Sequence, residues 1–265
     1  MQTESIKNII TVALGVCLVC SVLVAGAAVS LSSIQNQNKK NEKIKNILIA
    51  GGIYQKDVPV EKTYREKVDA KLVDLESGDL VPKDMQTGLL DIESFDIKKV
   101  ANDGKFGMRI PEKEDIARIK RRPKYMPIYF VKNGDQIEKL VLPIYGKGLW
   151  STLYGFIALD KDLKTIKGIT FYEHGETPGL GGEVDNPRWK KIWDGKKAYD
   201  NNGAVIIQVI KGRVNRQKPD AIHQVDGLSG ATMTTRGVDQ LVKYWLGKTG
   251  YETFLNKMKM EVANG

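Results

Sequence analysis

The chain has 265 residues, and its 41 lysines and arginines against 32 aspartates and glutamates give a formal net charge of +9. Hydrophobic residues make up 42% and charged residues 28%, which is a globular composition rather than a disordered or collagen-like one. The chain has only two cysteines, Cys17 and Cys20, and two histidines, His174 and His223. Because both cysteines lie near the N-terminus, the sequence excludes a disulfide framework, a thiolate zinc site and a cysteine-ligated iron–sulfur cluster from the remainder. Redox chemistry there would need an organic cofactor.

Residues 9–31 carry no charged side chain and predict a transmembrane helix, preceded by a short tail at residues 1–8. At about 1.5 Å per residue this helix spans roughly 35 Å, enough to cross a bilayer. The alternative is a cleaved signal peptide, but the apolar region of such a peptide runs only about 7–15 residues, which favours an uncleaved anchor. Cys17 and Cys20 fall on one face of the helix, where cysteine acts as a small hydrophobic residue.

The charges that flank this segment bear on which side of the membrane the rest of the chain lies. Lys7 precedes the segment and is offset by Glu4. Four lysines follow it: Lys39, Lys40, Lys43 and Lys45. A literal positive-inside reading places the large C-terminal part in the cytoplasm, but that rule weakens when a long domain follows.

Residues 32–125 are expected to form a stalk and a membrane-proximal α/β segment. Residues 32–46 are polar and continue the helix or form the stalk, and residues 58–75 carry helical spacing. The stripe that predicts this second helix consists of Val60, Tyr64, Val68 and Leu72. Residues 118–124 form a basic cluster of the kind that attracts nucleic acid or acidic lipid headgroups. No nucleic-acid motif accompanies it, so a solvated face is favoured and no nucleic-acid partner is expected.

From residue 126 the pattern predicts consecutive hairpins followed by helices. Residues 127–132 and 137–144 flank Asn133-Gly134, a two-residue hairpin signal. Further strands are predicted at residues 153–159, 166–172 and 204–210, and helices at residues 188–193, 237–246 and 251–260. This order favours an α+β fold, a mostly antiparallel sheet with flanking helices, preceded by one N-terminal transmembrane helix. Residues 126–265 are expected to form one domain.

The segment with the clearest chemical character runs from Asp226 to Gly237, with the sequence DGLSGATMTTRG. Small residues and hydroxyls crowd into a turn that opens a helix, and a helix N-terminus offers unpaired N–H groups and a positive dipole end to a phosphate. The alternative is a plain helix N-cap made by Thr232 or Thr234. The residues alone leave both interpretations open.

A glycine-rich loop, residues 173–182 (EHGETPGLGG), follows a predicted strand. Its four glycines and one proline predict either a shaped loop that wraps a flat ligand or a flexible surface loop. His174 and Glu176 have no third ligand nearby in the sequence, so no metal site is expected. A further stretch, residues 145–151, carries Trp150, which contacts an aromatic ligand or belongs to the core.

Together these segments resemble a known family of flavin-carrying membrane proteins. The pattern Asp226-x-x-Ser229-Gly230-Ala231-Thr232-x-Thr234 matches the motif at which a flavin transferase links FMN to threonine through a phosphoester. Residues 173–181 match the upstream element of the same FMN-binding domain. With its N-terminal helix and its length, the chain resembles the C subunit of the bacterial sodium-translocating NADH:quinone reductases. The alternative is the G subunit of the Rnf ferredoxin:NAD complex, which shares both motifs and is usually shorter.

The resemblance implies that FMN is attached to Thr234, the last threonine of the motif. It also implies a set of flavin-contacting residues: Trp150, Glu176, Thr177, Leu180, Leu228, Ser229 and Thr232. It implies no catalytic residue and no metal ligand on this chain.

The function that the resemblance implies is electron transfer within a redox-driven sodium pump that oxidises NADH and reduces ubiquinone. The partners would be the other subunits of that membrane complex and, during maturation, the flavin transferase. The family places the soluble domain on the periplasmic side of the bacterial inner membrane, against the lysine distribution. The remaining alternative is a membrane-anchored binding domain that never receives a flavin.

Overall fold

The computed structural model describes residues 6–264, and the chain divides after Lys43 into two compact units. The first unit contains most of α1 (Ile6–Ala50), a helix whose apolar part has a mean hydropathy of 2.7. By length and composition this part is able to cross a membrane, and its side chains are not buried against the protein. The helix expected over residues 9–31 is confirmed, and the polar residues 32–46 continue it rather than starting a separate element.

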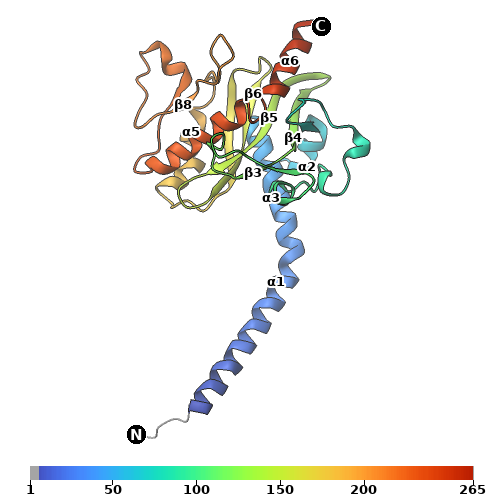
Figure 1. The fold of residues 1–265 in the computed structure, drawn as a ribbon, viewed down its shortest axis with the longest axis vertical. Helices are drawn as coiled ribbons and strands as arrows, with labels where there is room; N and C mark the ends of the chain where they lie inside the picture. Colours follow the sequence, from blue (N-terminus) through green and yellow to red (C-terminus); the bar gives the residue numbers. More distant parts are fainter. Residues whose placement is uncertain (1–5, 265) are drawn as a thin grey trace. The chain divides into compact units, whose positions relative to one another are not determined.

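The second unit, from Ile44 onward, contains a five-stranded sheet with helices and turns around it (Figure 1). Its helices are α2 (Val60–Lys67), α3 (Ile97–Asn102), α4 (Pro187–Lys191), α5 (Thr232–Leu246) and α6 (Glu252–Asn264). Its strands are β1 (Val68–Asp74), β2 (Gly107–Arg109), β3 (Arg121–Pro123), β4 (Tyr125–Asn133), β5 (Gln136–Lys147), β6 (Thr152–Asp160), β7 (Ile166–Glu173), β8 (Gln208–Val209) and β9 (Gln224–Val225). Four 3₁₀ turns complete it: η1 (Lys83–Met85), η2 (Gly88–Leu90), η3 (Gly181–Asp185) and η4 (Pro219–His223).

The main sheet has the strand order β1-β4-β5-β6-β7, and every neighbouring pair is antiparallel. The predicted α+β class with a mostly antiparallel sheet is therefore confirmed. Both faces of the sheet are covered, which explains why β4, β5 and β6 read as nearly continuous apolar runs. Successive side chains point to opposite faces, so Ile128 enters the main core while Tyr129 enters a second, smaller one.

Helix α5 covers the main-core face of the sheet, where Val238 and Leu241 are buried (Figure 1). The opposite face is covered by the last turns of α1, through Ile47 and Ala50, with Tyr64 of α2 packed beside them. The sheet is thus packed on both faces. The loop between β5 and β6 and the loop that follows β7 extend from the ends of its strands.

The second predicted helix, over residues 58–75, is wrong in its C-terminal half. Residues 60–67 form α2, but residues 68–74 form β1, whose Val68 lies opposite Val131 of β4. The spacing of four residues that predicted a helix is also two strand periods, so the apolar stripe could not distinguish them. Because β1 is an edge strand of the main sheet, residues 44–125 pack into the same unit as the rest. The expected domain boundary between residues 125 and 126 is kept only as a proposal that residues 126–265 hold the flavin.

Two other strand predictions differ in detail. The hairpin between β4 and β5 exists, but its two-residue turn is Gly134-Asp135, shifted by one from the predicted Asn133-Gly134. Gly134 has a φ of 60°, the left-handed conformation that such turns require. Of the predicted strand at residues 204–210, only Gln208–Val209 pairs as a strand, parallel to β9.

The basic cluster at residues 118–124 is not a purely solvated face. Arg121 donates to the backbone carbonyls of Ala101 and Asp103, at 2.8 and 3.2 Å. Arg122 is buried, and its guanidinium donates to the carbonyl of Pro123 at 3.0 Å. These cations satisfy carbonyl oxygens at the end of α3 and near β3, so much of the cluster is structural.

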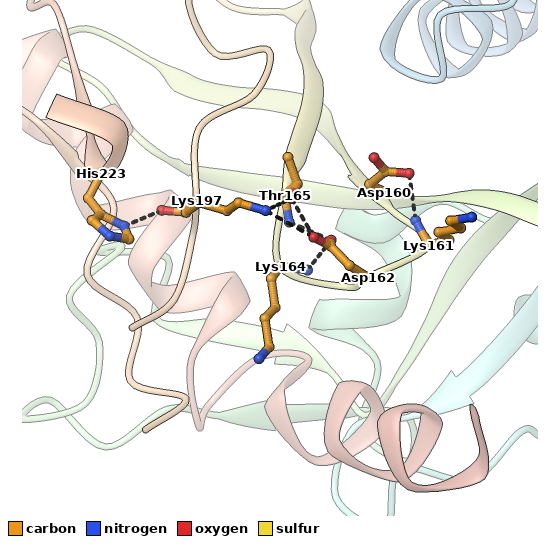
Figure 2. Close-up of polar contacts among 7 residues, drawn as sticks. All are labelled: Asp160, Lys161, Asp162, Lys164, Thr165, Lys197 and His223. Carbon is orange, nitrogen blue, oxygen red and sulfur yellow. Dashed lines mark hydrogen bonds and ion pairs between the residues drawn. The ribbon is translucent and has the colours of Figure 1, made fainter. Parts of the chain in front are cut away.

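The turn between β6 and β7 is tied to the segment that precedes η4 (Figure 2). The Asp162 carboxylate accepts from the backbone N–H groups of Lys164 and Thr165, at 2.9 and 2.7 Å, and from Lys197 Nζ at 3.1 Å. The carbonyl of Lys197 lies 2.8 Å from His223 Nδ1. This contact joins His223, at the end of η4, to the segment that carries Lys197. The segment that begins at Asp226 follows shortly after His223 in the chain.

Candidate functional site

Two residues far apart in the sequence, Glu176 and Thr234, meet at the centre of the candidate site. Thr234 lies in the first turn of α5, and its hydroxyl donates to Glu176 Oε2 at 2.6 Å. Both side chains are buried, Thr234 completely and Glu176 to 5% exposure. The fold therefore brings the glycine-rich loop and the threonine motif into direct contact.

The Glu176 carboxylate is held by the backbone of the loop between β5 and β6. Glu176 Oε2 accepts from the N–H of Leu149 at 3.2 Å, and Oε1 accepts from the N–H groups of Trp150 and Ser151 at 3.0 and 3.1 Å. Burial alone would raise the pKa of Glu176, but the Thr234 hydroxyl and these N–H groups hold its pKa below the usual range. The carboxylate is therefore ionised at neutral pH, and a buried charge at this position is tolerated because it is hydrogen-bonded.

Glycines allow the chain to approach this pair closely. A Cβ on Gly181 would lie 2.5 Å from Thr234 Oγ1 and 2.8 Å from Glu176 Oε2. A Cβ on Gly148 would lie 2.6 Å from Glu176 Oε1, and a Cβ on Gly237 would lie 2.4 Å from the carbonyl oxygen of Lys147. Gly237, predicted as the first residue of a helix, instead lies inside α5 where that helix crosses the end of β5.

The start of α5 differs from the N-cap interpretation. The residue at the cap is Ala231, and no side chain there accepts a capping hydrogen bond. Thr235, in the first turn, instead uses its Oγ1 to accept from the N–H of Leu228 at 3.0 Å. Neither Thr232 nor Thr234 is the cap, so the hydroxyls of this motif are left for other contacts.

His174 and Ser151 brace the glycine-rich loop. His174 Nδ1 lies 3.2 Å from the backbone N of Glu176, and its Nε2 lies 2.8 Å from Asp185 Oδ2. Ser151 Oγ accepts from the N–H of Gly175 at 2.7 Å. The hydrogen bond that His174 Nε2 donates to the Asp185 carboxylate raises the pKa of His174 above its usual value, and burial only partly opposes this.

Large apolar side chains are exposed beside the buried pair, although most such residues elsewhere in this unit are buried. Trp150 is 67% exposed and Leu180 is 45% exposed. Leu180 reaches toward the motif, since a Cβ on Gly230 would lie 3.0 Å from its Cδ2. The predicted core alternative for Trp150 is therefore wrong, and these side chains offer an apolar surface to a flat ligand.

The remaining predicted site residues lie on the same two segments with different exposure. Thr177, Ser229 and Thr232 are exposed, whereas Leu228 is buried in the main core. Sequence reasoning missed Leu149, Ser151 and Gly181, which contact Glu176 or crowd it. The backbone N–H groups that hold Glu176 carry no side-chain signal, so no residue pattern could have identified them.

Within the described residues, no group of three or more histidine, cysteine, aspartate or glutamate side chains is placed to hold a metal ion. The buried polar pair, the shaped glycine-rich backbone and the exposed tryptophan and leucine suit an organic, aromatic and phosphate-bearing ligand instead.

Comparison with known proteins agrees with this geometry. The family model for the FMN-binding domain matches residues 148–247, which include both Glu176 and Thr234. The C subunit of the Na(+)-translocating NADH-quinone reductase of Pseudomonas aeruginosa is 47% identical over 259 residues, covering 97% of each chain. The corresponding protein of Yersinia pestis is 42% identical over 262 residues, covering 97% of this chain and 95% of that one. The chain belongs to the C-subunit family of Na(+)-translocating NADH-quinone reductases.

Solved structures of this family share the fold. Shewanella oneidensis NqrC aligns with a TM-score of 0.76 at 34% identity, covering 84% of this chain and 99% of that one. The C subunit of the same type of reductase from Parabacteroides distasonis aligns with a TM-score of 0.63 at 30% identity, covering 85% of this chain and 96% of that one. The family expected from the two motifs is confirmed, and so is its choice over the Rnf G subunit.

Proposed function

We propose that this protein carries FMN, covalently linked to Thr234, and transfers electrons within a membrane-bound sodium-translocating NADH:quinone reductase. One observation carries the proposal: the fold places the motif threonine against Glu176 and beside the exposed apolar side chains of Trp150 and Leu180. The membership of the chain in the C-subunit family and its FMN-binding domain support the coarser part of this function. When bound, the flavin supplies the electron chemistry, and the protein supplies position and electrostatics.

Thr234 offers the alcohol oxygen that a flavin phosphate would esterify. In the linkage, Thr234 Oγ1 bonds to phosphorus in place of its hydrogen, which leaves as a proton. An alcohol does not displace oxide from a free phosphate, so the donor has to be an activated flavin phosphate such as a flavin dinucleotide. Its pyrophosphate bond breaks, and the other nucleotide leaves. We propose that a flavin transferase acts on the motif from Asp226 to Thr234 in this way.

Thr234 has to change its contacts to become linked, because its hydroxyl is buried and bonded to Glu176. A phosphodiester also retains a negative charge, which the Glu176 carboxylate would repel at hydrogen-bonding distance. The unpaired N–H groups in the first turn of α5 favour that charge. We therefore propose that Thr234 turns away from Glu176 when it is linked, toward the exposed side of the helix start.

The other flavin-contacting residues fall into two proposed groups. Trp150 and Leu180 are exposed apolar side chains suited to the aromatic ring. The polar side chains of Thr177, Ser229 and Thr232 are exposed near the loop and motif backbones and suit the ribityl chain or phosphate. Glu176 and Leu228 are buried, so we propose that they support the residues that contact the flavin and do not form its exposed binding surface.

The placement of the protein in the cell is proposed from the family and the first helix. We propose that residues 9–31 of α1 anchor the chain in the bacterial inner membrane, and that residues 126–265 form the flavin-binding domain on the periplasmic side. The partners are the other subunits of the complex, which hold the NADH and quinone sites. A covalent linkage keeps a flavin from being lost on the far side of the membrane.

The experiment that tests this function is the replacement Thr234→Ala in cells that contain the flavin transferase. We expect folded protein without covalent flavin, because the acceptor oxygen is removed. Intact mass and peptide mapping measure this, with Thr235→Ala, next to the motif but outside it, as the matched control that keeps the flavin. Flavin found on Thr232 or Thr235 in the Thr234→Ala variant would refute the assignment. A wild-type chain without any flavin mass would favour a binding domain that receives no flavin.

A further inference from the structure

The imidazole of His174 contacts the candidate site through the backbone of Glu176. The N–H of Glu176 points at His174 Nδ1, with 3.2 Å between the nitrogens. A backbone N–H is only a donor, so Nδ1 has to accept and carries no hydrogen. The hydrogen of the neutral ring is then on Nε2, which donates to Asp185 Oδ2 at 2.8 Å. These contacts assign one tautomer to His174.

The two contacts of His174 favour opposite charge states. Asp185, at the end of η3, and Glu176, in the loop of His174 itself, are the charged groups that face the ring, and both raise the pKa of His174. In the protonated ring, however, Nδ1 becomes a donor that faces the donor N–H of Glu176. Protonation therefore keeps the contact to Asp185 and removes the acceptor of Glu176 N–H.

We propose that His174 is a positioning residue for Glu176, and that its protonation releases Thr234 for flavin attachment. The neutral ring holds the backbone of Glu176, whose carboxylate in turn holds the Thr234 hydroxyl at 2.6 Å. Loss of the first contact loosens the second, because the two are carried by one residue. The proposal rests on the proposed function in one respect, that Thr234 has to leave Glu176 before it is linked.

Glu176 does not change its protonation state over the pH range in which His174 is tested. The hydrogen bonds to its carboxylate keep the pKa of Glu176 below the usual range, so it stays ionised between pH 5 and 8. The ordinary pKa of histidine, 6.5, lies within that interval, and the contact with Asp185 raises the pKa of His174 above it, so acidification toward pH 5 protonates the ring. A change in attachment rate over this range therefore reports on His174 rather than on Glu176.

Two substitutions separate the contacts of the ring. His174→Asn places an amide oxygen near the position of Nδ1, so it keeps an acceptor for Glu176 N–H and cannot titrate. His174→Gln places its amide near Nε2, so it keeps a donor for Asp185 and offers no acceptor to Glu176. The Asn variant thus mimics the neutral ring, and the Gln variant mimics the protonated one.

The experiment measures the rate of covalent flavin incorporation into the full chain in detergent, with flavin adenine dinucleotide and a purified flavin transferase, from pH 5 to 8. Each rate is divided by that of His174→Asn, which removes the pH dependence of the transferase. We expect the wild-type ratio to rise about fivefold on acidification, the effect of one neutral hydrogen bond. The ratio for His174→Gln should be high at every pH. A wild-type ratio that does not change with pH, or a His174→Gln ratio near one, would overturn the proposal.

A second measurement is made on the unmodified wild-type chain, so it does not depend on either variant folding. The ¹⁵N shift of the Glu176 amide and the ¹³C shift of the His174 ring are followed by NMR in selectively labelled protein. We expect both signals to titrate with one pKa, above 6.5. A Glu176 amide that does not respond while His174 titrates would refute the positioning role. Flavin found on a residue other than Thr234 would refute the proposed function. The titration would still test the hydrogen bond between His174 and the Glu176 amide.

Discussion

Glu176 is the residue on which the contacts of the candidate site converge. Its carboxylate accepts from three backbone N–H groups, of Leu149, Trp150 and Ser151, and from the hydroxyl of Thr234. A buried carboxylate with this many donors is stable as an anion. The contacts of the site are therefore formed without a ligand, and the Thr234 hydroxyl is bonded to Glu176 instead of being exposed to solvent.

Gly181 tests how tightly this pair is packed. A Cβ at this position would lie 2.5 Å from Thr234 Oγ1 and 2.8 Å from Glu176 Oε2, so one of them has to move. We expect Gly181→Ala to lower the free energy of unfolding by about 1–3 kcal/mol, the usual cost of overpacking. Urea unfolding followed by circular dichroism measures the change.

The matched control is Gly175→Ala in the same loop. A Cβ there would lie 3.4 Å from the Ser151 Cβ, which is an ordinary van der Waals contact. We expect this variant to unfold within about 1 kcal/mol of the wild type. Equal effects of the two substitutions would show that the loop is loose around Glu176 and Thr234.

At the residue scale, the sequence predicted several residues of the candidate site but not how they contact one another. The motifs pointed to Thr234, Glu176 and Trp150, and the structure brings the first two into contact. Their pairing was not predictable because 58 positions separate them, and it depends on how α5 crosses the sheet. The burial of Thr234 was not predictable either, because the sequence does not show that the loop of Glu176 covers the start of α5.

At the element scale, the predictions were confirmed where a residue pattern is compatible with only one type of secondary structure. The hairpins of β4 to β7 were predicted because apolar runs alternate with turn residues, and each run has a partner next to it in the chain. β1 was missed because its partner β4 lies far along the chain and its spacing fits a helix equally well. The start of α5 was placed five residues late because Gly237 was taken as a boundary, whereas its close packing against Lys147 explains it.

The turn between β6 and β7 yields a prediction about pH. Burial alone would raise the pKa of Asp162, but hydrogen bonds from Thr165, Lys164 and Lys197 lower it well below its usual value. A depressed pKa in the folded state contributes stability above the unfolded pKa, about 3.9, and loses it as the pH falls toward the folded value. We expect Asp162→Asn to lower the free energy of unfolding by a constant amount from pH 5 to 8. The difference from the wild type should shrink below about pH 4.

Urea unfolding at a series of pH values measures this difference. The control is Asp160→Asn in the same turn, since the Asp160 carboxylate accepts one backbone hydrogen bond, from Lys161 (Figure 2). A difference for Asp162→Asn that stays constant down to pH 3 would show that the charge of Asp162 does not stabilise the fold.

At the scale of the whole molecule, the charge distribution disagrees with the topology that we propose. Lysines follow the apolar part of α1, which by the positive-inside rule would keep the second unit in the cytoplasm. Domains as long as residues 44–265 cross membranes largely regardless of flanking charge, so the rule is weak for this chain. The family resemblance motivates the proposed periplasmic location, and the sequence offers no stronger signal, because one helix sets only two possible orientations.

This topology is testable with single-cysteine variants in a chain in which Cys17 and Cys20 are replaced by alanine. Asn201 lies in an exposed turn of the second unit, and Asn8 lies at the start of α1, before the apolar segment. We expect an impermeant maleimide to label Asn201→Cys in intact spheroplasts, because that turn is proposed to face the periplasm. Asn8→Cys should be labelled only after permeabilisation, because a single crossing places the two sites on opposite sides. The reverse pattern would show that the lysines set the orientation, and labelling of both sites in intact spheroplasts would contradict a single membrane crossing.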